Sequence, residues 1–150
     1  MKIRNVLVAT TMAAAAMVTG AAGPAAASVS TQAAGIGTYT VTVRTGNLSG
    51  AGTDATVRLT VFGTLGTSPN VDLDNDDDNF EAGKTDVFGP FNWYGIGDVG
   101  YIALSKKGGS DWFPEYLDVY EQSESAQYHC TINEWLRGNL TKYYGCNRVR

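Results

Sequence analysis

The chain has 150 residues, of which 43% are hydrophobic and 17% charged, a composition that excludes wholesale disorder and fits a single folded domain. A formal net charge of −4 argues against a nucleic-acid ligand, because phosphate binding needs clustered lysine and arginine. One histidine and two cysteines exclude a zinc finger and a multi-histidine metal site.

Residues 1–27 have the pattern of a secretory signal peptide. Lys2 and Arg4 give a positive start, an apolar stretch follows, and three alanines at residues 25–27 form a cleavage site. A transmembrane anchor is the weaker alternative, because two glycines and a proline end the apolar run short of the ~20 residues that span a bilayer. We therefore expect a secreted, extracellular protein. Removal of the peptide deletes two bases and no acids, leaving a net charge of −6.

The rest of the chain has the periodicity of β-structure. Residues 28–37 are small and polar, which is typical of a flexible lead-in. Apolar and polar residues then alternate over residues 39–44 and 55–61, as in strands with one buried face. Further short strands are expected near residues 87–91, 99–106, 112–120 and 128–136. Without a long helical period, this pattern predicts an all-β sandwich or barrel.

Cys130 and Cys146 are the only cysteines. An oxidising compartment favours a disulfide between them, which would stabilise the fold by roughly 3 kcal/mol. The alternative is a catalytic thiol, and His129 is the only base available to ionise it.

The segment 72–81 carries six carboxylates in ten residues. Such a loop is costly to fold unless a cation or solvent screens the charges, and its hard oxygen ligands suit Ca²⁺. It is not an EF-hand, because Asn79 and Thr85 stand where that motif has glycine and glutamate. A solvated acidic loop is the alternative.

Four motifs follow one another along the chain: Tyr39–Gly46 with the turn Ala51–Ala55, Phe80–Phe88 with Ile96–Val99, Asp111–Val119, and Tyr128–Leu136. Together they resemble the PLAT (lipoxygenase-homology) domain over about residues 38–136. The resemblance implies an eight-stranded antiparallel β-sandwich that binds lipid surfaces or protein partners, often with Ca²⁺, here as a stand-alone secreted member. The basic segment 137–150 has no counterpart in it and is expected to be a tail, tied back by the Cys130–Cys146 disulfide.

The resemblance also implies site residues. In calcium-binding members, the ligands come from the Gly-Thr-Asp turn and from the acidic residues around the Phe-Glu motif. The corresponding metal ligands of this chain are Gly52, Thr53, Asp54, Asp78, Asn79 and Glu81. Membrane contact needs exposed apolar side chains beside the cation, and Trp93 and Tyr94 are the candidates. Packing in the core is the alternative for Trp93.

We expect no catalytic residues and no enzyme. The chain lacks a G-x-S-x-G elbow, and a packed sandwich leaves little room for a deep cleft. The residue types alone do not exclude a glycosidase, because the chain has many pairs of carboxylates. We expect a monomer, and the expected partner is a membrane lipid surface or a secreted or membrane protein. The alternatives are a calcium-independent protein-interaction domain and an inhibitor of a secreted hydrolase.

Overall fold

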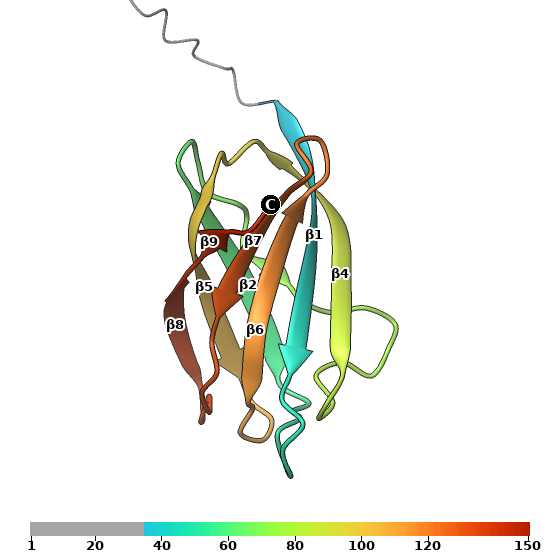
Figure 1. Cartoon of the computed structure of the whole chain (residues 1–150). Coiled ribbons are helices and arrows are strands. Elements are labelled where there is room, and N and C mark those ends of the chain that lie inside the picture. Colours follow the sequence, from blue (N-terminus) through green and yellow to red (C-terminus); the bar gives the residue numbers. More distant parts are fainter. Residues whose placement is uncertain (1–34) are drawn as a thin grey trace, which may run out of the picture. The chain divides into compact units, whose positions relative to one another are not determined.

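The computed structural model describes residues 35–150, which form nine strands and no helix (Figure 1). The predicted signal peptide and most of the predicted lead-in lie outside these residues. The strands are β1 (Ile36–Thr45), β2 (Thr56–Gly63), β3 (Val71–Asp72), β4 (Thr85–Tyr94), β5 (Val99–Lys107), β6 (Pro114–Glu121), β7 (Ala126–Thr131), β8 (Leu140–Gly145) and β9 (Asn147–Arg148). In this part of the chain, no helix is long and apolar enough to cross a membrane.

The strands form two antiparallel sheets packed face to face. One sheet has the order β4-β1-β6-β7-β9, and the other has the order β3-β2-β5-β8. The predicted all-β sandwich is therefore confirmed. The structure has nine strands rather than eight, and two of the nine, β3 and β9, are only two residues long.

The core follows from the alternation of residues along the strands. In β1, Tyr39, Val41 and Val43 are buried, while the threonines between them are more exposed. The inward residues of β2 repeat the pattern across the sandwich. Burial of these apolar faces between the two sheets supplies the main stabilising free energy of such a fold.

The sandwich continues beyond the predicted boundary at residue 136. β8 pairs with β5 and β9 pairs with β7, so the segment 137–150 is part of both sheets and not a tail. The sequence pattern missed β8 because this edge strand buries none of its residues fully.

The predicted disulfide between Cys130 and Cys146 is confirmed. Cys130 lies in β7, and Cys146 lies between β8 and β9, where the chain crosses from one sheet to the other. Both cysteines are consumed in this bond, so neither is a catalytic thiol.

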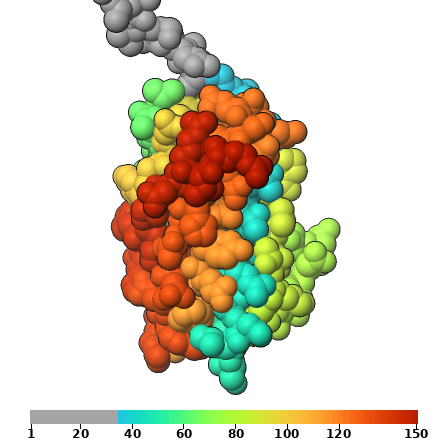
Figure 2. Space-filling view, in the orientation of Figure 1, coloured from blue at the N-terminus to red at the C-terminus, as the bar shows by residue number. Residues whose placement is uncertain are grey.

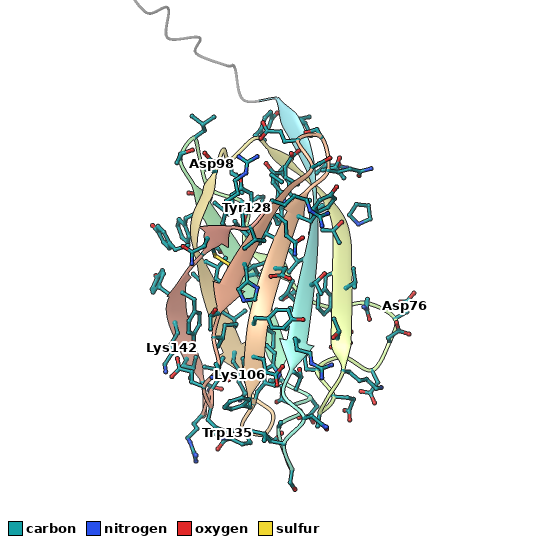
Figure 3. All side chains as sticks on the ribbon, viewed as in Figure 1. Asp76, Asp98, Lys106, Tyr128, Trp135 and Lys142 are labelled. Atoms are coloured by element: carbon teal, nitrogen blue, oxygen red, sulfur yellow. A yellow bond between two sulfur atoms is a disulfide. The ribbon has the colours of Figure 1, made fainter. Side chains whose placement is uncertain are left out.

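The pairing of β1 with β4 defines two ends of the molecule. Arg44 faces Thr85 at one end, which we call the acidic-loop end because the acidic segment leads into β4 there. Ile36 faces Tyr94 at the other, which we call the opposite end. A strand of ten residues separates the two ends by roughly 30 Å. Figure 3 labels Asp98 and Tyr128 near the opposite end, and Trp135 near the acidic-loop end.

Candidate calcium site

The acidic segment is anchored on both sides by buried apolar residues. Leu73 and Phe80 are 2% and 3% exposed. The Leu73 amide donates to the Val57 carbonyl at 2.9 Å, and the Thr53 amide donates to the Phe80 carbonyl at 3.1 Å. The loop of residues 74–79 is therefore held against the Gly-Thr-Asp turn that precedes β2.

Phe80 adopts a backbone conformation that is rare outside glycine. Its φ is +62°, and its amide donates to Asp86 Oδ2 at 2.8 Å. Its ring packs against Phe88 and Trp112, with centroid distances of 5.6 and 4.9 Å. This packing and the hydrogen bond hold a strained residue in place at the end of the loop. The backbone of Gly52 passes so close that a β-carbon there would lie 2.9 Å from the Phe80 carbonyl oxygen.

A cavity of about 440 Å³ lies between the turn and the loop. Its lining includes five aspartates, Asp54, Asp72, Asp74, Asp77 and Asp78. Among the described residues, only Asp72 of these five has a basic partner, Arg58, whose Nε lies 2.5 Å from Asp72 Oδ1. The carboxylates of Asp54, Asp74, Asp77 and Asp78 therefore concentrate negative charge in the cavity, with no basic partner among residues 35–150.

Asn79, which lines this cavity, has one side-chain oxygen without a partner among the described residues. Its Nδ2 donates to Asp74 Oδ1 at 3.1 Å, whereas its Oδ1 is buried and has no hydrogen-bond partner among the described residues. A buried acceptor without a donor costs about 1–3 kcal/mol. Carboxylate and amide oxygens are the ligands that Ca²⁺ prefers, so this donor set fits the ion.

Four of the six predicted ligands, Thr53, Asp54, Asp78 and Asn79, line this one cavity. Gly52 lies next to it, with its carbonyl accepting from Ser110 Oγ at 3.0 Å, and Glu81 is not part of the lining. Asp74 and Asp77 line it as well, although neither is among the six ligands that the family resemblance implies. In residues 35–150, no three Asp, Glu, His or Cys side chains are close enough to form a ready metal-ligand set.

The predicted lipid contact is wrong for Trp93. This side chain is only 4% exposed and stacks between Tyr39 and Phe91, at centroid distances of 5.0 and 5.1 Å. Tyr94 is 77% exposed, but it lies at the opposite end and not beside the acidic cavity. The large apolar side chains exposed toward the acidic-loop end are Val87, near the start of β4, and Leu48, in the loop after β1 that projects from the molecule in Figure 2.

His129 lies apart from the acidic cavity. Its Nδ1 is 2.6 Å from Asp118 Oδ1, on neighbouring strands β7 and β6. Neither residue lines the cavity, so His129 is not part of the acidic site.

The strands and loops described above define an antiparallel β-sandwich with an acidic cavity among the loops at one end. The PLAT/LH2 domain family matches residues 39–149, and the chain belongs to this family. Domains of this kind are non-catalytic modules that bind lipid or protein.

Known proteins with similar sequences and structures are much longer than this chain. Lipoxygenase homology domain-containing protein 1 of Mus musculus is 35% identical over 101 residues, which is 65% of this chain and 5% of that protein. The crystal structure of coral 8R-lipoxygenase, described as activated by calcium through a C2-like domain, has a TM-score of 0.63 and 26% identity, covering 72% of this chain and 17% of that one. The structure of a calcium-dependent 11R-lipoxygenase has a TM-score of 0.57 and 28% sequence identity, covering 73% of this chain and 17% of that one.

Proposed function

We propose that this protein is a secreted, non-catalytic module that binds Ca²⁺ in the acidic cavity and thereby attaches to a lipid surface. The observation that carries the proposal is the buried Asn79 Oδ1, which has no partner among the described residues and belongs to the same cavity as Asp54 and Asp78. A cation coordinated there would satisfy this oxygen and relieve the repulsion between the carboxylates.

Side-chain oxygens of Asp54, Asp78 and Asn79 would hold the ion. Main-chain or hydroxyl oxygens of the Gly52–Thr53 turn would complete the ligand set, in line with the flexible coordination that Ca²⁺ accepts. Glu81 follows the anchored Phe80 in the chain, and its carboxylate would join the ligand set after a small movement of the loop. Calcium activation of the coral 8R-lipoxygenase and calcium dependence of the 11R-lipoxygenase support this choice of ion.

The bound ion would also permit contact with anionic lipid. Without residues 1–27 the chain has a net charge of −6, so such a surface repels it unless Ca²⁺ bridges the carboxylates and the headgroups. Val87 is 55% exposed toward this end, and Leu48, in the loop after β1, is 46% exposed. Its loop is tied to the acidic-loop end, because the Gly83 amide donates to the Gly46 carbonyl at 3.0 Å.

The test is sedimentation with phosphatidylserine vesicles in millimolar Ca²⁺ or in EDTA. We expect binding only with Ca²⁺, and a loss of binding in Leu48→Asp. The matched control is Tyr94→Asp, which changes a side chain at the opposite end that is more exposed than Leu48 (77% against 46%) and should bind like the parent protein.

Two results would contradict the lipid proposal. One is equal binding in Ca²⁺ and EDTA. The other is Ca²⁺ binding with no affinity for vesicles, which would assign the attachment to a protein partner.

A further inference from the structure

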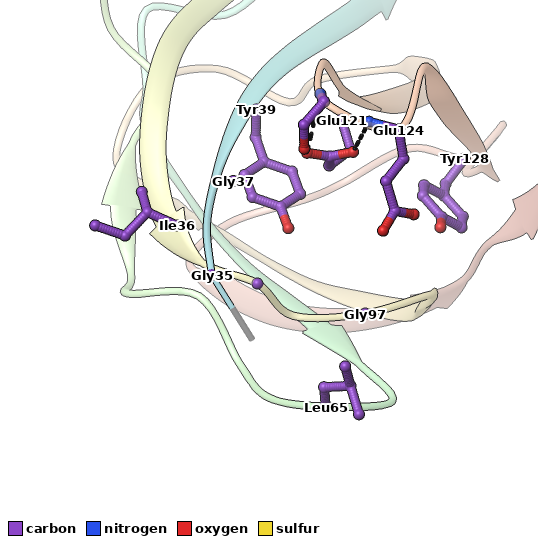
Figure 4. Close-up of a pocket in the computed structure, with 11 residues that line it drawn as sticks. Gly35, Ile36, Gly37, Tyr39, Leu65, Gly97, Glu121, Glu124 and Tyr128 are labelled. Carbon is purple, nitrogen blue, oxygen red and sulfur yellow. Dashed lines mark hydrogen bonds between the residues drawn. The ribbon is translucent and has the colours of Figure 1, made fainter. Parts of the chain in front are cut away.

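A second cavity, of about 260 Å³, lies at the opposite end of the sandwich (Figure 4). The start of β1, the loop between β4 and β5, and the turn between β6 and β7 enclose it. No basic side chain belongs to its lining. The proposed calcium function makes no use of this site.

Two glutamates give the cavity its charge, and they have different roles. Glu121 is 6% exposed, and its carboxylate accepts from the Ser123 amide at 3.1 Å, the Glu124 amide at 2.6 Å and the Ser123 hydroxyl. Glu121 therefore fixes the turn. The Glu124 carboxylate has no hydrogen bond or ion pair to any described residue, so it is available to a ligand.

Tyr39 presents a hydrogen-bond donor to the same space. The residue is 2% exposed, and its hydroxyl oxygen accepts from the Ile96 amide at 3.3 Å. Within residues 35–150, the hydroxyl proton has no acceptor, and Figure 4 shows the hydroxyl pointing into the cavity near Glu124. The Tyr128 hydroxyl, by contrast, donates to Asp98 Oδ1 at 2.8 Å.

The electrostatics keep this donor protonated. Burial raises the pKa of Tyr39, the Ile96 hydrogen bond opposes the increase, and the charges of Glu121 and Glu124 add to it. A ligand in the cavity thus meets both a negative carboxylate and a neutral O–H group.

Two exposed apolar side chains border the cavity. Ile36 and Leu65, 66% and 62% exposed, belong to its lining together with four glycines, Gly35, Gly37, Gly95 and Gly97. At Gly97, where φ is +73°, a β-carbon would lie 2.4 Å from Thr64 Oγ1. The cavity, at about 260 Å³, is smaller than the pockets that bind drug-sized molecules, so its ligand must be small.

We propose that this cavity binds a small amino alcohol, that is, an ammonium group with a neighbouring oxygen. The ammonium pairs with the Glu124 carboxylate, the oxygen accepts the Tyr39 hydroxyl proton, and the methylene groups contact Ile36 and Leu65. A bare metal cation would use neither the Tyr39 donor nor the two apolar side chains.

The probes are 2-aminoethanol, ethylamine and ethanol, titrated into ¹⁵N-labelled protein in EDTA while amide shifts are recorded by NMR. We expect 2-aminoethanol to shift the amides of Gly35, Gly37, Gly97 and Glu124 in a saturable way, with millimolar affinity because the ligand is so small. Ethylamine should bind roughly three- to tenfold more weakly, since it lacks the oxygen. Ethanol should cause no saturable shift.

Glu124→Gln tests the ion pair without endangering the fold, because the side chain has no partner to lose. It should weaken 2-aminoethanol binding by about tenfold or more. Asp76→Asn removes the same charge from the acidic loop and should leave the affinity unchanged. Equal losses in both variants, or no saturable shift in the parent protein, would overturn the proposal.

A vesicle experiment in EDTA separates two sources of this chemistry. Binding to phosphatidylethanolamine but not to phosphatidylcholine vesicles would identify the ligand as a lipid headgroup. Binding of free 2-aminoethanol alone would support the same site with a soluble ligand.

Discussion

Asp86 and Phe80 are joined by a hydrogen bond, from the Phe80 amide to Asp86 Oδ2 at 2.8 Å, that positions the acidic loop. Asp86 is the second residue of β4 and is 8% exposed, and Phe80 has a φ of +62°. The core thus determines where Asp78 and Asn79 lie, because they are the two residues before Phe80. The position of the proposed ligands therefore depends on Asp86, which is not itself a proposed ligand.

Replacing Asp86 with alanine should destabilise the domain and weaken calcium binding together. The Phe80 amide would lose a charged acceptor in a buried place, which costs about 1–3 kcal/mol. Urea unfolding measures this loss. Glu124→Ala, a carboxylate without a partner, should change stability by less than about 0.5 kcal/mol, and an equally small effect of Asp86→Ala would contradict the anchoring role.

Reduction of the Cys130–Cys146 bond should lower stability substantially. The bond closes a segment with a sequence separation of 16, and the chain-entropy estimate for such a loop is roughly 3 kcal/mol. Urea unfolding with and without a reducing agent gives the difference. The Cys130→Ser/Cys146→Ser variant should match the reduced parent protein and should not respond to the reductant.

Tyr128 should make the fold sensitive to alkaline pH. Burial, followed by the hydrogen bond to Asp98 and the charge of Asp98, raises its pKa to about 12 from 10.0. Because the folded protein holds this proton more tightly, the resulting stability is complete below about pH 10 and is lost as the pH rises toward 12. Unfolding free energies at pH 9 and 11 should fall more steeply in the parent protein than in Tyr128→Phe. Equal slopes would show that Tyr128 does not cause the sensitivity.

Lys106 and Lys107 should differ sharply in chemical reactivity. Lys106 is 1% exposed, and its Nζ donates to the carbonyls of Gly108 and Gly138 at 2.9 and 3.2 Å, whereas Lys107 is exposed. Brief treatment with an amine-acylating reagent, followed by tandem mass spectrometry, should modify Lys107 and spare Lys106. Similar modification of both would contradict the burial of Lys106.

The sequence predicts the strands of this fold where burial alternates strictly. β1 is such a strand, and its face could be assigned from periodicity alone. β4 is different, because its pairing with β1 shifts register between Tyr39 and Val41. Its inward residues change from Asp86 and Phe88 to Trp93, so a regular alternation would place Trp93 outside.

The candidate site was only partly predictable for a similar reason. Charge density identifies the acidic loop, and the family resemblance supplies Asp54 as its neighbour. The contact between the two depends on Phe80 and Gly52, which carry no charge and give no ligand signal. Long-range contacts of this kind follow from the packing of the core and not from local pattern.

Calorimetric titration with Ca²⁺ tests the central claim most directly, with Asp54→Asn as the site variant and Glu124→Gln as a control for charge at the other end. The account predicts saturable heat in the parent protein and in Glu124→Gln, little heat in Asp54→Asn, and a melting temperature that rises with Ca²⁺. No heat at millimolar Ca²⁺, or equal heat in all three proteins, would contradict a calcium site in this cavity.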